Sequence, residues 1–174
     1  MFTDFAAWLQ ATPISVTIQS VTWIIPLIQS IHIVTIGIVF VSILMVVLRI
    51  LGVARVDQPF DAVLVRFSPW MWIGLVVMAI TGAVLIVGEP IREFTTTSFW
   101  LKMVLIVIGA ASAAAFRWSL GSVAGDRQPV FSFGLKSAAV ATLLLWVVII
   151  FLGRAIAYDT EVWESLSLSY DAEA

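Results

Sequence analysis

The sequence contains one histidine, His32, inside a long apolar segment, and Gln29 stands three residues before it. Residues three apart share one face of a helix. A neutral imidazole is a common ligand of haem iron and of other metals, and it also exchanges protons near neutral pH. Because a charged group deep in lipid costs roughly 2.5 kcal/mol or more, we expect His32 to be neutral and to meet a hydrogen-bond partner, a cofactor or a wet cavity.

Further side chains, on other apolar segments, would complete a cofactor site. Met78 would supply the second axial ligand of a b-type haem, because methionine sulfur binds haem iron opposite histidine. Lys102 and Arg154 would provide cations for the haem propionates, and Trp146 would flank the ring. The predicted cofactor-binding residues are therefore His32, Met78, Lys102, Arg154, Gln29 and Trp146, with His32 and Met78 as the metal ligands.

Other interpretations of the same residues remain open. Copper would bind His32 together with methionine, because thioether sulfur suits Cu(I); the candidates are Met71, Met78 and Met103. His32 of a second copy would give bis-histidine ligation across a dimer. Without any cofactor, His32 would bond a neighbouring helix, Lys102 would reach the interface and Arg154 would pair with Glu89.

The composition places these residues in membrane-spanning helices. Of the 174 residues, 61% are hydrophobic and 11% are charged, whereas a soluble domain has about 45–50% apolar and about 25% charged residues. Four apolar segments reach the roughly 20 residues that cross a hydrocarbon core, and lipid permits only helices there. We predict an all-α integral membrane protein, an antiparallel bundle of four transmembrane helices at about 19–48, 70–88, 99–118 and 134–157, forming one domain over 1–158 with an acidic tail at 159–174.

Shorter apolar stripes, one in residues 2–9 and one in residues 60–67, predict interfacial amphipathic helices. Pro26 removes a backbone donor, so we expect the first span to kink near Thr22. A set of polar side chains is predicted to share one face of that span: Gln19, Thr22, Gln29 and His32.

Small residues are concentrated at 109–115 in the third span and at 137–141 in the fourth, which predicts close helix packing in one half of the bundle. The other halves hold larger side chains, so we expect any cavity there, toward the outer side. On the second span, one helical face carries small residues around a methionine and would contact the first span or a flat ligand; its members are Gly74, Met78, Thr81 and Gly82.

The charges between the spans predict the orientation. Six basic residues fall on one side and three on the other, which places the first group in the cytoplasm and both termini outside. The six are Arg49, Arg55, Arg66, Arg117, Arg127 and Lys136. Most acidic residues fall on the opposite side: Asp4, Glu89, Glu93, Asp159, Glu161, Glu164, Asp171 and Glu173. We therefore expect a multi-pass protein of the bacterial cytoplasmic (inner) membrane.

Several motifs resemble those of an uncharacterised family of small four-span bacterial membrane proteins. They are the histidine of the first span, the LRILG that ends it, the FWLK of residues 99–102 and the GRAIAY of residues 153–158. The resemblance covers about residues 12–158 and implies a four-helix membrane fold without an assigned activity. More loosely, a helical bundle with a buried histidine is similar to the CopD-type copper-resistance domain and to b-type cytochromes, which usually contain several intramembrane histidines.

Missing motifs argue against several classes of protein. The chain has no cysteine, no acidic partner in a span for a hydrolase triad, and no nucleotide-binding or zincin motif. Scattered basic residues argue against nucleic acid binding.

We therefore expect a redox or cofactor-binding membrane protein, with haem b near His32. The alternatives are a proton or small-solute channel or transporter using Gln29, His32 and Thr35, and an accessory subunit that anchors a partner through its tail. Each would contact the lipid bilayer as a homo-oligomer or within a membrane complex.

Overall fold

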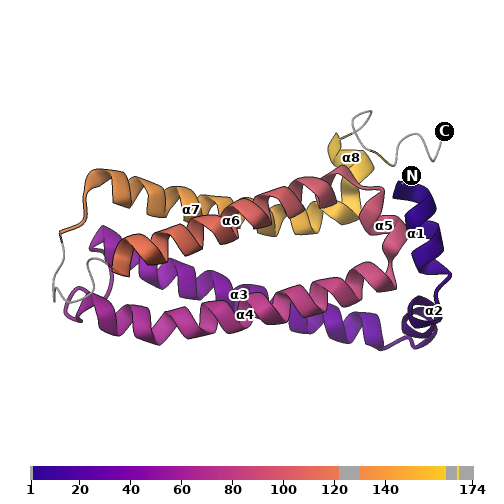
Figure 1. Ribbon diagram of the computed structural model, residues 1–174, viewed down its shortest axis with the longest axis horizontal. Coiled ribbons are helices and arrows are strands. Elements are labelled where there is room, and N and C mark those ends of the chain that lie inside the picture. Colours follow the sequence, from indigo (N-terminus) through magenta and orange to yellow (C-terminus); the bar gives the residue numbers. More distant parts are fainter. Residues whose placement is uncertain (1, 122–129, 164–167, 169–174) are drawn as a thin grey trace.

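The computed structural model describes residues 2–121, 130–163 and 168 of the chain. Four of its helices are long and apolar enough to cross a membrane: α3 (Ile24–Leu51), α4 (Phe60–Gly88), α6 (Thr97–Gly121) and α7 (Phe133–Ala155). Within the described residues there is no strand, which confirms the predicted all-α bundle. The helices lie lengthwise in two layers, α3 with α4 and α6 with α7 (Figure 1). The layers meet where α3 packs against α7.

Short helices gather at one end of the bundle (Figure 1). They are α1 (Phe2–Gln10), α2 (Pro13–Ser20), α5 (Pro90–Phe94), the 3-10 helix η1 (Ile156–Tyr158) and α8 (Asp159–Trp163). We call this end the capped end, and the opposite end, where residues 52–59 connect α3 to α4, the loop end. The predicted helix in residues 2–9 is confirmed as α1, which lies across the capped end (Figure 1). It packs on α5 through an edge contact between Phe5 and Phe94, with ring centroids 5.4 Å apart.

The first span differs from its prediction in where it begins. Thr12 caps α2 and Pro13 occupies its first turn, and the chain then turns at residues 21–23, so α3 begins at Ile24 rather than near residue 19. Pro26 therefore lies in the first turn of α3, where a missing N–H breaks no helical hydrogen bond. The kink predicted near Thr22 is instead a complete break of the helix at residues 21–23, before the proline.

The predicted interfacial helix at residues 60–67 is also wrong, because α4 runs without a break from Phe60 through Pro69 to Gly88. Its apolar stripe faces the protein interior, where Phe60 and Val63 are fully buried. The ring of Phe60 meets Phe131 edge-on, with centroids 4.9 Å apart. An amphipathic stripe thus packs against the chain itself instead of lying on lipid.

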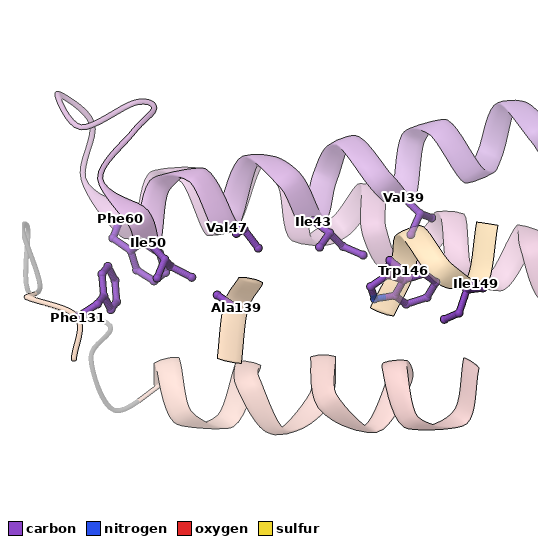
Figure 2. Close-up of a cluster of buried hydrophobic side chains, with 9 residues drawn as sticks. All are labelled: Val39, Ile43, Val47, Ile50, Phe60, Phe131, Ala139, Trp146 and Ile149. Atoms are coloured by element: carbon purple, nitrogen blue, oxygen red, sulfur yellow. The ribbon is translucent and has the colours of Figure 1, made fainter. Parts of the chain in front are cut away.

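The apolar core lies mainly between α3 and α7, toward the loop end. Figure 2 shows its members: Val39, Ile43, Val47, Ile50, Phe60, Phe131, Ala139, Trp146 and Ile149. On the outer faces large apolar side chains are exposed, among them Val65 at 75% and Phe151 at 71%. Exposed apolar faces on every span are what a surrounding bilayer requires.

Arg49 ties the loop end together. It lies in the last turn of α3, is 6% exposed, and donates from Nε and Nη2 to the carbonyl of Gln58 at 3.3 and 3.0 Å. Gly52 ends the helix in the left-handed conformation, at φ 75°, which glycine adopts without a Cβ clash. The arginine that was expected to act as a topological charge is therefore also a buried support for the 52–59 connection.

Candidate functional site

The polar face of α3 meets α4 at one hydrogen bond. His32 Nδ1 lies 2.7 Å from Thr81 Oγ1, and the Thr81 hydroxyl also donates to the carbonyl of Val77 at 2.8 Å. A hydroxyl has one hydrogen, so with that hydrogen on Val77 the Thr81 oxygen accepts from Nδ1–H. We infer the tautomer of His32 from this network. It leaves Nε2 as an unprotonated acceptor.

The imidazole rests against the backbone of α4. A Cβ placed on Gly82 would lie 3.6 Å from His32 Cε1, and one placed on Gly74 would lie only 2.5 Å from Val39 Cγ2. The small-residue face predicted on the second span is therefore a contact face for α3. It holds the two helices close on the loop-end side of the histidine.

Lys102 reaches the same region from α6. A Cβ on Gly153 of α7 would lie 3.4 Å from its Nζ atom, so the ammonium rests against that glycine. Lys102 also interacts electrostatically with His32 and with Glu93 of α5. Within the described part of the chain, it has no hydrogen bond and no carboxylate within 4 Å. Of these two interactions only the one with Glu93 is attractive, because a protonated His32 would be repelled by the ammonium.

Glu93 brings a carboxyl group into this region from the capped end. It is 9% exposed, and Arg92 Nη2 lies 3.8 Å from its Oε1. Burial raises the pKa of Glu93 above its ordinary value, although the positive charges of Lys102 and Arg92 act in the opposite direction. We call His32, Thr81, Lys102 and Glu93 the polar site; it combines residues of α3, α4, α6 and α5.

Asp159 supports the polar site from the start of α6. Its carboxylate accepts hydrogen bonds from the backbone N–H of Thr97 at 3.1 Å and of Ser98 at 2.8 Å. The Trp163 indole donates to Ser98 Oγ at 2.8 Å and fastens α8 there. A carboxylate at a helix N-terminus is favourable, which offsets the unfavourable position of the Lys102 cation in the first turns of α6.

The predicted tail therefore begins as a docked helix, α8. The remaining acidic residues of the tail lie outside the described residues, as do Arg127 and the side chain of Arg117; they are Glu164, Asp171 and Glu173.

The structure assembles only part of the predicted cofactor site. His32 and Lys102 interact, and the Met78 carbonyl accepts weakly from Thr81 at 3.3 Å, but the Met78 side chain packs against the apolar core. Trp146 belongs to that core and lies about two turns before Gly153 on α7, toward the loop end.

The other predicted members lie outside the polar site. Arg154 is exposed and donates to the Tyr158 hydroxyl at 3.0 Å, so it does not face His32. It does not pair with Glu89 either, because that carboxylate bonds Arg92 at 2.7 Å. Gln29 is half-buried on α3 and forms no hydrogen bond with any described residue.

The predicted polar stripe is divided between two helices. Gln19 lies on α2 and donates to Ser15 Oγ at 2.8 Å, while Ser15 donates to the carbonyl of Val87 at 2.7 Å. These bonds fasten α2 to the end of α4. Gln19 is therefore part of the capped end and does not share a helix with His32.

A cavity of about 70 Å³ lies between the two layers in the loop-end half. We expected any cavity in the other half, and a more open hollow of about 520 Å³ does lie at the capped end, beside Gln19, Glu89 and Arg92. Small side chains from three spans line the cavity: Ser42, Ala113 and Ala139. His32 does not line it. Among the described residues no group of three or more His, Asp or Glu side chains could hold a metal ion.

Fold and site together define a multi-pass, four-span membrane protein with a polar site near one end of an apolar bundle. Residues 12–159 match the model of a family of unknown function, DUF6644, and the chain belongs to this family. Among curated proteins none matches the chain. The same holds for solved structures.

Proposed function

We propose that this protein carries protons, or a small solute together with protons, through its bundle, and that His32 is the group that takes up and releases the proton. The observation that carries the proposal is that Lys102 interacts electrostatically with His32 of α3 and also with Glu93 of α5, within spans that are mostly apolar. Ionisable residues at membrane depth are expensive and typically mark ion or proton pathways.

The charges around His32 suit reversible protonation. Nε2 would accept a proton that arrives from the capped end, while Nδ1–H remains on Thr81. The nearby Lys102 ammonium would repel the imidazolium, and the Glu93 carboxylate would stabilise that ammonium. A proton taken up by Glu93 removes that stabilising charge. The three groups would therefore exchange protons as a coupled set, not one at a time.

The same face of α3 continues toward the loop end with Thr35 and Ser42, both buried. Their hydroxyls bond carbonyls of their own helix at 2.7 Å. Between them, Val39 packs against the backbone at Gly74. In the proposed passage this apolar contact is the barrier, and transport would require α3 and α4 to separate there.

Charge asymmetry supports the orientation that we propose for the protein in a bacterial inner membrane. Arg49, Arg55 and Lys136 surround the loop end, which would face the cytoplasm under the positive-inside rule. The capped end, with Glu93 and Asp159, would then face outward. The polar site would exchange protons with the outer side.

Flux measurements in liposomes test this proposal. Purified protein is reconstituted with an internal pH-sensitive dye, and an imposed pH gradient should collapse faster than in empty liposomes. His32→Ala should remove the added flux. Ser30→Ala is the matched control, because Ser30 is exposed on another face of α3 and its hydroxyl donates to the Pro26 carbonyl of the same helix at 2.8 Å, and it should retain the flux. Equal flux in wild type and His32→Ala would refute the proposal.

Cofactor binding is the second candidate, and the free Nε2 of His32 favours it. Metal-bound histidines usually have their other ring nitrogen held by a hydrogen bond, as Thr81 holds Nδ1 here. One chain would supply this axial ligand and the Lys102 cation, but Arg154 and Trp146 lie elsewhere, so one chain does not form a complete haem site. His32 of a second copy would have to supply the other axial ligand, which gives bis-histidine ligation across a dimer. A Soret band that His32→Ala abolishes would support this candidate, and a colourless, metal-free preparation would refute it.

A further inference from the structure

The cavity in the loop-end half is lined by residues of all four spans. It lies one to three turns beyond Val39 on α3, on the opposite side of that contact from His32. Its lining is mostly apolar but contains four side chains with polar atoms: Ser42, Ser68, Thr142 and Trp146. No chemistry of the polar site uses these residues.

Trp146 gives this cavity its polar character. The side chain is 3% exposed, and the indole Nε1 has no hydrogen-bond partner among the residues that the structure describes. In Figure 2 the indole nitrogen lies on the side of the ring that faces Ala139 and the loop end. A buried N–H without a partner is rare in folded proteins, and it usually indicates a partner such as an ordered water.

The neighbouring hydroxyls complement this donor. Ser42 donates to the carbonyl of Ile38 at 2.7 Å, and Thr142 donates to the carbonyl of Ala138 at 2.9 Å. Each hydroxyl hydrogen is thereby used, and each oxygen keeps a lone pair that accepts. The cavity therefore offers one N–H donor, two hydroxyl acceptors and, in addition, the Ser68 hydroxyl. A water molecule, with one acceptor for Nε1 and two hydrogens for the hydroxyls, has the matching set.

Size points to the same occupant. The cavity measures about 70 Å³, whereas roughly 10–15 Å³ on this measure holds one water and about 150 Å³ accommodates a benzene ring. A few water molecules fit in this volume, but a benzene ring does not. A cavity with this much room holds a water where about two to four polar groups can bond it, and the few polar groups in this mostly apolar lining reach that number.

We propose that this cavity is an internal water-binding site, in which Trp146 Nε1 donates to a water that donates in turn to Ser42 and Thr142. The bound water would hydrate the loop-end half of the passage, opposite the Val39 contact from His32. That role rests on the proposed function, whereas the site itself does not.

Nuclear magnetic resonance of the full chain in lipid nanodiscs tests the site. The Trp146 indole N–H signal is assigned by its loss in Trp146→Phe, and transfer of magnetisation from water to this N–H is then measured. We expect a cross-peak at the water frequency in the wild type, and its loss in a Ser42→Ala/Thr142→Val variant that retains the indole signal. Ser112→Ala is the matched control, because the Ser112 hydroxyl also bonds its own helix, at 2.7 Å from the Ile108 oxygen, but does not line the cavity. This control should keep the cross-peak.

Two further outcomes separate the site from its alternatives. A dry cavity would give no water cross-peak, and xenon would shift the signals of the lining methyl groups; that result would overturn the water site. In His32→Ala the water cross-peak should persist even where proton flux is lost. Persistence with unchanged flux would refute the proposed function and leave the water site supported.

Discussion

His32 Nδ1 of α3 lies 2.7 Å from the hydroxyl oxygen of Thr81 on α4, a hydrogen bond between residues 49 positions apart in sequence. Thr81 is oriented by its own bond to Val77, so α4 determines which nitrogen of the imidazole carries the hydrogen. Hydrogen bonds between transmembrane helices contribute only about 0.6 kcal/mol on average. The main effect of this hydrogen bond is therefore to orient the imidazole ring, and its contribution to stability is small.

Thr81→Val separates these two effects. It keeps the shape of the side chain and removes the acceptor, so we expect a loss of only about 0.6–1.7 kcal/mol in the free energy of unfolding. The nitrogen chemical shifts of His32 should meanwhile change from one tautomer to a mixture. Thr81→Ser restores the hydroxyl and should restore the single tautomer. An unchanged tautomer in Thr81→Val would show that another group orients the ring.

The close approach of α3 and α4 makes Gly74 sensitive to substitution. A Cβ there would lie 2.5 Å from Val39 Cγ2, and β-branched valine cannot easily rotate away. Gly74→Ala should lower the free energy of unfolding by about 1–3 kcal/mol, as overpacked cores do. Gly37→Ala is the control, since nothing lies within 4 Å of its Cβ position, and it should not destabilise the protein. Equal stability of both variants, measured by denaturant titration in detergent, would contradict this close approach of the two helices.

Glu93 should make stability depend on pH. Its pKa is raised above the ordinary value of 4.5, mainly by burial. The folded state therefore holds this proton more tightly than the unfolded state, so stability should fall as the pH rises from about 4.5 through the folded pKa. Below that window both states are protonated and the penalty is absent. Glu93→Gln should flatten this part of the stability profile, while Glu161→Gln, an exposed carboxyl on α8, should leave it unchanged.

The spans were predictable from sequence because lipid leaves the backbone only one solution, a helix of about 20 or more apolar residues. Their ends were less predictable. Pro26 is compatible with a kink or with a helix start, and the stripe beginning at Phe60 has the same pattern whether it meets lipid or Phe131. These choices depend on contacts between segments, which one sequence does not contain.

The candidate site was predictable only in its centre. His32 and Lys102 stood out because charged and polar groups are costly in apolar segments. Their partners did not, because Thr81 and Glu93 are ordinary residues until the fold brings them near. Arg154 shows the opposite error: its motif suggested an inward cation, but the helix turns it toward Tyr158.

Asp159 provides a test of how α8 supports the polar site. Its carboxylate accepts from two backbone N–H groups at the start of α6, so Asp159→Ala should cost about 0.5–2 kcal/mol of the free energy of unfolding. Asp159→Asn keeps one oxygen acceptor and should cost less. If α8 acts as a support, both variants should also increase proteolytic cleavage near Trp163. If both variants were cleaved and unfolded like the wild type, Asp159 would not be a support for α8.

Arg49 should be the basic residue most sensitive to replacement, because its role depends on the shape of the guanidinium. It is buried and donates two hydrogen bonds to the Gln58 carbonyl, a geometry that lysine cannot reproduce. Arg49→Lys should therefore destabilise the protein, and Arg49→Ala should cost about 1.5–3 kcal/mol, the range for hydrogen bonds to charged groups. Arg154→Lys is the comparison, because Arg154 is exposed and, among the described residues, bonds Tyr158 alone. The thermal unfolding of this variant in detergent should match that of the wild type. If Arg49 only contributed a positive charge that sets the membrane orientation, lysine would replace it without loss, as at position 154. A stable Arg49→Lys variant would therefore show that Arg49 is not a structural support.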